Sequence, residues 1–292
     1  MNILFKFYHI MYENPFLFKL NCFFLRTGIE KQIAYRFKTV KKEKYATENK
    51  NAKSFFNSNI NTINKNLELL ADEKSKKIYK TIIDYRIHRK PLKKDSYSLN
   101  DQYFVKDFVE INDQEVFIDC GAFVGDTLNN LFIVAQKNNK KIKKAVAFEP
   151  EHKNYTLLKK YFSHDSRIIP IEAGVSDNDK EMSLIGEHTY ARLSTENNAS
   201  GTTVKLKSID NTPECSDATY IKMDIEGAEM SALIGATKTI KKNKPKLAIC
   251  IYHGYEDMIR IIPFIHDLNP SYKLYIRHHS RDTSETVLYA IP

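Results

Sequence analysis

Cysteine is scarce in this sequence, and its placement excludes a common class of metal site. The four cysteines, Cys22, Cys120, Cys215 and Cys250, are far apart, and no two have the spacing of metal ligands. Cys120 and Cys250 fall within or at the end of apolar runs, where a thiol behaves as a small apolar side chain. This usage favours a reducing, cytoplasmic compartment.

Long hydrophobic runs are also missing. The N-terminal segment is rich in aromatic and aliphatic residues, but Lys6, Glu13, Pro15 and Lys19 interrupt it before about 20 apolar residues accumulate. The same interruptions argue against a cleavable signal, and no small-residue cleavage site follows. We expect the segment to pack as helix against the rest of the protein. The alternatives are peripheral contact with a membrane and a surface for homo-oligomer formation.

The chain has fewer acidic than basic residues, 36 against 45, which gives a net charge of +9. This excess favours anionic partners, although a solvated lysine-rich surface explains it equally well. No zinc finger or RNA-binding strand motif is present, so we expect no nucleic-acid partner. With 292 residues, 42% of them apolar, the chain suits one large globular domain with an N-terminal extension.

Apolar strand-like runs alternate with helical patterns in the C-terminal two thirds of the chain. Strands are predicted at 116–119, 145–149, 168–172, 219–223, 246–251, 272–276 and 286–291, and helices at 127–138, 151–163, 228–242 and 255–268. Such alternation is typical of a doubly wound, Rossmann-like α/β sheet that is mostly parallel. Only a short polar turn joins the last two strands, which therefore predict an antiparallel hairpin.

The first hundred residues show a different pattern. Apolar residues recur at helical spacing from Ile60 to Leu70, and Asp72 is a good N-cap for a second helix. We therefore predict a helical N-terminal extension over residues 1–100 and a catalytic α/β domain over residues 101–292.

A glycine-containing loop follows the first strong strand. The strand ends at Asp119, the loop contains Gly121 and Gly125, and a helical pattern begins near Thr127. Strand, tight glycine turn and helix together are typical of a nucleotide-type ligand site. Glycine permits close approach of the backbone, and the helix N-terminus directs amide dipoles at the ligand.

Two further strands end in acidic residues. Glu149 closes the second strand, where its carboxylate can accept hydrogen bonds from both hydroxyls of a ribose. Asp224 and Glu226 follow the strand at 219–223. Ligands on such sheets bind beyond the carboxyl ends of the strands, so these acids and the glycine loop should line one crevice.

The glycine pattern discriminates between cofactors. A dinucleotide fingerprint has a third glycine, which is absent here, and the acid at Asp119 would repel a pyrophosphate. The same acid suits a cationic ligand that carries an amine. S-adenosylmethionine has a sulfonium, an ammonium and a ribose, so the sequence favours this methyl donor over NAD. An oxidoreductase that uses NAD, and an RNA methyltransferase, are the alternatives.

These motifs together resemble the FkbM family of class I S-adenosylmethionine-dependent methyltransferases. The matching stretches are 119–126, Phe148-Glu149-Pro150, 221–229, Arg277-His278-His279-Ser280 and 285–289. The resemblance covers roughly residues 97–292. It implies a seven-stranded sheet with an inserted last strand and O-methylation of a small or sugar-like acceptor, often in polysaccharide or natural-product assembly.

The resemblance also implies roles for individual residues. Asp119, Gly121, Ala122 and Gly125 would hold the methionine moiety, Glu149 the ribose, and residues 173–176 would lie near the adenine. The full set of expected cofactor-binding residues is Tyr103, Asp119, Gly121, Ala122, Gly125, Glu149, Pro150, Gly174, Val175 and Asp224. Capping of a turn by Asp119 and of a helix by Glu149 are the structural alternatives.

Methyl transfer to a hydroxyl requires removal of its proton, and histidine has a suitable pKa. His253 follows the strand at 246–251 on the same rim as Asp224, so these two are the expected catalytic residues. Candidate acceptor-binding residues are Glu226, Arg192, Arg277 and His278. Asp224 and Glu226 suggest a divalent metal, but no further oxygen ligand is evident, so none is expected. An alternative role for Glu226 and Glu229 is to complement the positive end of the following helix.

Overall fold

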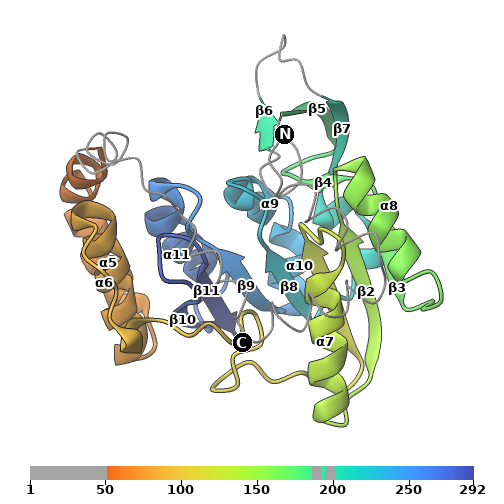
Figure 1. The fold of residues 1–292 in the computed structure, drawn as a ribbon, viewed down its shortest axis with the longest axis horizontal. Helices are drawn as coiled ribbons and strands as arrows, with labels where there is room; N and C mark the ends of the chain where they lie inside the picture. The colour runs from red at the N-terminus through yellow and green to blue at the C-terminus, as the bar shows by residue number, and fades with distance from the viewer. Residues whose placement is uncertain (1–50, 186–191, 195–201) are drawn as a thin grey trace, which may run out of the picture.

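The computed structural model describes residues 51–185, 192–194 and 202–292 (Figure 1). The apolar segment at the N-terminus, for which we expected packing, membrane contact or oligomer formation, lies outside these residues. No helix within the described residues is both long and apolar enough to cross a membrane.

A seven-stranded sheet forms the centre of the protein, as predicted. Its strand order is β10-β11-β9-β8-β1-β2-β3. The strands are β1 (Glu115–Cys120), β2 (Ile142–Phe148), β3 (Ile168–Ile171), β8 (Tyr220–Met223), β9 (Lys246–Cys250), β10 (Lys273–His278) and β11 (Thr286–Ile291). Six strands run in the same direction, whereas β11 is antiparallel to both of its neighbours, β9 and β10. The predicted C-terminal hairpin is therefore present, and β11 is inserted between β9 and β10.

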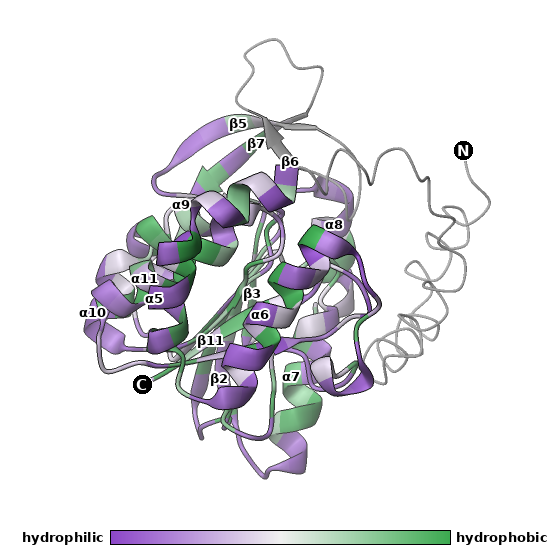
Figure 2. Cartoon of the chain, turned by 90° about the vertical axis from the view of Figure 1, so that its left-hand side faces the viewer, coloured by the Kyte–Doolittle hydropathy of each residue, from purple (hydrophilic) through white to green (hydrophobic). Residues whose placement is uncertain are grey.

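Helices cover both faces of this sheet because successive strand residues point in opposite directions. Ile118 of β1 packs into the core formed with α9 (Glu229–Ile234), α10 (Thr237–Asn243) and α11 (Tyr255–Leu268). Phe117 packs into the opposite core, which also includes the segment 103–111 and residues of two further helices. Those helices are α7 (Asp126–Lys137) and α8 (His152–Tyr161). Figure 2 shows the apolar strands between helices of mixed hydropathy.

One predicted helix is wrong in its length. The pattern over 228–242 predicts a single helix, but the chain forms α9 and α10 with a break at Gly235 and Ala236. The carbonyl of Gly235 accepts hydrogen bonds from the Asp210 amide and the Ser208 hydroxyl. A Cβ on Gly235 would lie 2.1 Å from the Ser176 carbonyl oxygen. Tertiary contacts therefore divert this carbonyl and interrupt the helix.

A second, four-stranded sheet was not predicted. Its order is β4-β7-β5-β6, with β4 (Gly174–Val175), β5 (Lys180–Ile185), β6 (Arg192–Ser194) and β7 (Thr202–Lys207). The sheet lies at the top of Figure 1, next to α8 and α9. Its described apolar cluster is small and consists of the buried Val204 and Leu206, with the partly buried Met182 packed against them. So weak an apolar pattern explains why the sequence did not reveal it. Short 3-10 turns at Lys94–Ser96, Ile209–Asn211 and Pro213–Cys215 complete the described elements.

The described N-terminal helices pack beside the β10 edge of the central sheet. They are a helical stretch at 51–58, α5 (Ile60–Leu69) and α6 (Glu73–His88). Asp72 caps α6, as predicted, by accepting a hydrogen bond from the Ser75 amide. The Tyr79 hydroxyl donates to the Met258 carbonyl of α11, which fixes α6 against the domain. The predicted boundary near residue 100 stays a prediction.

Candidate active site

The glycine loop after β1 is held close to two other parts of the protein. Gly121 has φ +78°, and a Cβ there would lie 2.1 Å from the Asp224 carbonyl oxygen. Gly125 has φ +91° and precedes α7, and a Cβ there would lie 2.2 Å from a ring carbon of Phe162. The glycines are therefore required for packing of the loop against β8 and α8. We had expected ligand approach to be the reason for them.

Asp119 is fully buried and pairs with a lysine that the sequence analysis did not use. The Asp119 Oδ1 lies 2.9 Å from the Lys222 Nζ, and the two residues are directly opposite each other on β1 and β8. Burial raises the pKa of Asp119, and the charge of Lys222 opposes this shift. The electrostatic argument from the sequence is therefore corrected, because this carboxylate is neutralised inside the protein and has no exposed surface.

Glu149 connects the end of β2 to the glycine loop. Its carboxylate accepts hydrogen bonds from the amides of Phe123 and Glu151, at 2.8 and 3.0 Å, and from the Asn154 side chain at 3.3 Å. The helix that follows is capped by Glu151 rather than by Glu149. Burial raises the pKa of Glu149 to about 7. A carboxylate has about four acceptor positions, so one remains for a further donor.

The other expected cofactor residues are largely internal. Ala122 is 1% exposed, and its amide donates to the Phe148 carbonyl. Gly174 and Val175 are buried in β4, and a Cβ on Gly174 would lie 3.7 Å from Pro150. The structure thus places Pro150 beside Gly174, at the junction between the two sheets.

Asp224 follows β8 and is held by two tyrosines. The Tyr103 hydroxyl donates to Oδ2 at 2.7 Å and the Tyr252 hydroxyl to Oδ1 at 3.0 Å. Burial raises the pKa of Asp224, but the charges of Lys222 and His253 outweigh it and hold the pKa below its ordinary value. Tyr103 is 8% exposed and packs in the core on this side of the sheet, with its hydroxyl directed at Asp224. Its expected contact with the cofactor stays a prediction.

His253 lies among three carboxylates. Its Nδ1 is 2.9 Å from Glu229 Oε1, and its Nε2 is 3.4 Å from Asp224 Oδ1 and 3.7 Å from Glu226 Oε2. Burial lowers the pKa of His253, but these acids outweigh it and raise the pKa to about 9. The imidazole of the protein alone therefore holds a proton at neutral pH. The expected role of His253 as a catalytic base stays a prediction.

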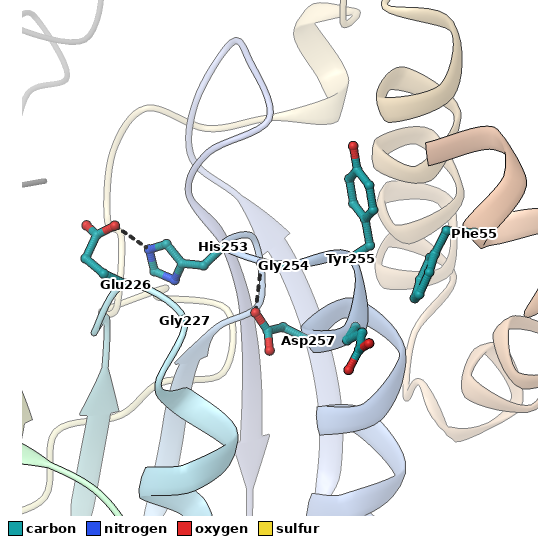
Figure 3. A pocket seen from close by; sticks show the side chains of 8 residues that line it. Phe55, Glu226, Gly227, His253, Gly254, Tyr255 and Asp257 are labelled. Atoms are coloured by element: carbon teal, nitrogen blue, oxygen red, sulfur yellow. Dashed lines mark hydrogen bonds and ion pairs between the residues drawn. The ribbon is translucent and has the colours of Figure 1, made fainter. Parts of the chain in front are cut away.

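A pocket of about 390 Å³ opens beside this cluster (Figure 3). Glu226, Gly227 and His253 form one side, and Phe55 and Tyr255 lie on the other side. The Phe55 and Tyr255 rings are 5.7 Å apart, so a residue of the N-terminal extension contributes to the wall. Burial raises the pKa of Glu226 to about 7, although 44% of its side chain is exposed.

Two of the expected acceptor-binding residues, Arg277 and His278, are buried away from this pocket. Arg277 is buried and pairs with Asp72, with 2.8 Å between Nη2 and Oδ2. His278 is 1% exposed, and its Nδ1 lies 2.9 Å from the Thr286 hydroxyl. Arg192 begins β6, and its side chain is outside the part of the chain that the structure describes. The roles expected for Arg277 and His278 are therefore corrected to structural ones.

Sequence analysis missed two residues of the site and misjudged a third. Lys222 and Tyr252 were not considered, and the only role considered for Glu229 was to complement a helix dipole. A lysine inside an apolar strand is a usable signal, because a buried ammonium requires a partner. The contact of Glu229 with His253 depends on the α9 approach to the loop after β9, which no local pattern reports.

A family model described as "Methyltransferase FkbM domain" matches residues 119–272. The chain belongs to the FkbM methyltransferase family. The match spans the glycine loop, Glu149, Asp224 and His253, so the crevice described above lies inside the FkbM domain. Because this family transfers methyl groups, the assignment favours the methyl donor over NAD. Among curated proteins, no sequence matches the chain.

Solved structures give the same family for the fold. The methyltransferase FkbM from Methylobacillus flagellatus KT has a TM-score of 0.68 and 26% identity, and the match covers 81% of this chain. This chain spans 60% of the length of that protein. An rRNA methylase from Streptococcus thermophilus has a TM-score of 0.38 and 14% identity, over 62% of this chain and 88% of that one. At so low a TM-score the second likeness has no functional weight.

Proposed function

We propose that the protein is an S-adenosylmethionine-dependent O-methyltransferase that acts on a hydroxyl of a sugar, glycan precursor or other small molecule. The observation that carries this proposal is the placement of Asp224, Glu226 and His253. These side chains meet at the carboxyl ends of β8 and β9, beside the glycine loop, and Glu226 and His253 line the pocket. A family methyltransferase domain with polar groups gathered at its crevice is suited to methylation of an oxygen nucleophile.

The cofactor side of the crevice fits S-adenosylmethionine. The carboxylate of Glu149 is nearly buried and has an acceptor position left, which a ribose hydroxyl would satisfy. The N-terminus of α7 and the loop at Gly121 and Gly125 would hold the methionine moiety. When bound, this cofactor supplies a methyl group on a positively charged sulfonium. The chain itself has to bind the acceptor, orient its oxygen and accept its proton.

We assign activation of the acceptor to the side chains that line the pocket. Glu226 is the more exposed carboxylate there, so we assign to it the acceptance of the hydroxyl proton. His253 is placed to contact the acceptor oxygen, and Glu229 fixes the ring from the other side. Asp224, held by its two tyrosines, keeps the imidazole in place.

The lining of the pocket supports a small acceptor over a nucleic acid. Acidic side chains of Glu226, Glu256 and Asp257 line it and would repel the phosphates of an RNA. The aromatic rings of Phe55 and Tyr255 offer an apolar face of the kind on which a sugar ring can stack. These features favour a neutral polyhydroxyl acceptor, in place of the anionic partner that the net charge alone suggests.

The test is a cofactor titration combined with a single substitution. Calorimetry should show binding of S-adenosylmethionine and no binding of NAD. His253→Ala should reduce turnover by about 10²- to 10⁴-fold and leave affinity for the cofactor nearly unchanged. His152→Ala, at a surface histidine paired with Glu172, is the matched control and should retain activity. Loss of cofactor binding in His253→Ala would refute the assignment of His253 to the acceptor side.

A further inference from the structure

Three side chains from separate elements converge on one point of the crevice. Asp224 follows β8, Glu229 begins α9, and His253 follows β9. One ligand atom from each lies within 4.8 Å of the others. Two carboxylate oxygens and an imidazole nitrogen at this separation need only small movements to coordinate one ion at ordinary bond lengths.

Buried atoms of this cluster lack hydrogen-bond partners. Glu229 has no exposed surface, and its Oε2 makes no hydrogen bond in the described residues. The His253 side chain is 8% exposed; its Nδ1 lies 2.9 Å from Glu229 Oε1, and its Nε2 comes no nearer than 3.4 Å to a carboxylate oxygen. Buried polar atoms are normally satisfied, so an orphaned carboxylate oxygen in a residue of this cluster indicates a missing ligand.

The charges also call for a cation. Asp224, Glu226 and Glu229 contribute three carboxylates around a single imidazole. No lysine or arginine among the described residues forms an ion pair with any of the three; Lys222 acts on Asp224 from a distance and is paired with Asp119. Such a cluster in a partly dry crevice is costly unless a positive charge is bound.

We propose that Asp224, Glu229 and His253 bind a divalent metal ion. Mixed carboxylate and imidazole ligands suit a first-row ion such as Mn²⁺, Co²⁺ or Zn²⁺ better than Ca²⁺, which prefers oxygen ligands alone. The Tyr103 and Tyr252 hydroxyls hold the Asp224 carboxylate in place, as second partners of metal ligands commonly do. His253 lines the pocket, so water or a substrate oxygen can reach the ion from that side.

The ion would activate the acceptor, and this part rests on the proposed function. A hydroxyl bound to a divalent cation loses its proton more readily, because the metal stabilises the alkoxide. Glu226 lies 3.7 Å from the His253 Nε2 and outside the three ligands, so it is placed to take that proton. The oxygen lone pair released in this way forms the new bond to the methyl carbon, while the carbon–sulfur bond breaks and its electron pair stays on sulfur.

The test measures metal binding without turnover. Protein freed of metal with a chelator is titrated with Mn²⁺, followed by electron paramagnetic resonance, and with Co²⁺, followed by visible absorption. We expect one ion per chain and d–d bands that show nitrogen and oxygen ligation. Glu229→Gln and His253→Gln should each weaken binding by at least about 100-fold. His152→Gln, which alters the surface pair with Glu172, should bind as the wild type does.

A variant that removes a single hydroxyl tests the site with little risk of unfolding the protein. Tyr252→Phe removes only the hydroxyl that donates to Asp224 and should weaken Mn²⁺ binding by about 10-fold. Equal Mn²⁺ affinity in the wild type, Tyr252→Phe and Glu229→Gln would overturn the proposed site, as would the absence of binding. Calorimetry with S-adenosylmethionine on the same samples separates the two proposals, because cofactor binding without metal binding refutes only the metal site.

Discussion

Lys222 and Asp119 face each other across the two central strands of the sheet, and both side chains are buried. Their charged atoms are 2.9 Å apart, and the lysine also donates to the Gly121 carbonyl at 2.7 Å. Substitution Lys222→Met removes the partner and leaves an unpaired carboxylate in the core. We expect a loss of about 3–5 kcal/mol in the free energy of unfolding, measured by urea denaturation at pH 7.

Two control variants distinguish this pair from an ordinary ion pair. Lys180→Met breaks a pair with Asp177 at the surface and should cost less than about 1 kcal/mol. The double substitution Asp119→Leu with Lys222→Met removes both charges and should recover most of the stability. If Lys222→Met alone proved as stable as the wild type, the buried pair would have no energetic role.

Gly121 and Gly227 both have positive φ, but their surroundings differ. An alanine Cβ at Gly121 would lie 2.1 Å from a backbone oxygen, whereas at Gly227 the nearest atom is 3.8 Å away. Gly227→Ala should therefore cost only the backbone strain, about 1–2 kcal/mol. Gly121→Ala adds a steric clash and should cost about 2–5 kcal/mol. Thermal unfolding of the two variants checks this order, and an inverted order would contradict it.

The proposed contact of Glu149 with the ribose predicts that affinity for the cofactor depends on pH. Burial raises the pKa of Glu149 to about 7, so protonation below that pH would remove the charge that is proposed to accept the ribose hydroxyls. Affinity for S-adenosylmethionine should rise as the pH increases from 6 to 8. Glu149→Gln should weaken binding by about 10- to 100-fold and flatten this dependence. Calorimetry at three pH values tests both statements. A pH profile that is unchanged in Glu149→Gln would assign the titration to another group.

The contact of Asp72, the N-cap of α6, with Arg277 of β10 makes the stability of the protein depend on pH in the acid range. Burial raises the pKa of Asp72, but hydrogen bonds from Arg277 and Ser75 outweigh this and lower the pKa to about 2. In the unfolded chain the Asp72 carboxyl has its ordinary pKa of 3.8, so as the pH falls the unfolded chain binds a proton before the folded protein does. The stabilisation is therefore present above about pH 4 and is lost as the pH falls toward 2.

Arg277→Met removes the main cause of this shift. Urea unfolding at pH 3 and pH 6 should show a smaller difference in stability for the variant than for the wild type. Arg260→Met, at an exposed pair within α11, serves as the control and should keep the wild-type difference. If Arg277→Met showed the same difference in stability between pH 3 and pH 6 as the wild type, the pairing of Arg277 with Asp72 would not contribute to acid stability.

Much of the sheet could be predicted because its strands are short, apolar and separated by helical patterns. The glycine loop, Glu149 and Asp224 were placed correctly at its carboxyl edge, since parallel strands bring their ends to the same side. The second sheet escaped prediction because β4 has two residues and the described parts of its other strands bury few apolar side chains. Register and face can be read from a strong pattern, but not from a weak one.

The charges of the site could be predicted only in part. Sequence spacing identifies acids at strand ends, but it does not say which of them are paired. Lys222 alternates with apolar neighbours in β8, and only the pairing of β8 with β1 puts it opposite Asp119. The environment of His253 likewise depends on Glu229, which reaches it from another helix. Ionisation states follow from such tertiary neighbours, so the raised pKa of His253 could not be predicted from the sequence.

The insertion of β11 between β9 and β10 has a consequence for the order of unfolding. In the described sheet β10 is joined to the other strands only through β11. It contacts α6 through Arg277 and Ser75, and the segment between α5 and α6 through the bridge between Leu70 and Leu274. Release of β11 would therefore detach β10 and remove its contacts with α6, which would then be held to the domain by its remaining contacts, such as the hydrogen bond of Tyr79 with α11. Segments more than two hundred residues apart in sequence thus belong to one cooperative unit, in which their backbone amides should exchange with solvent together.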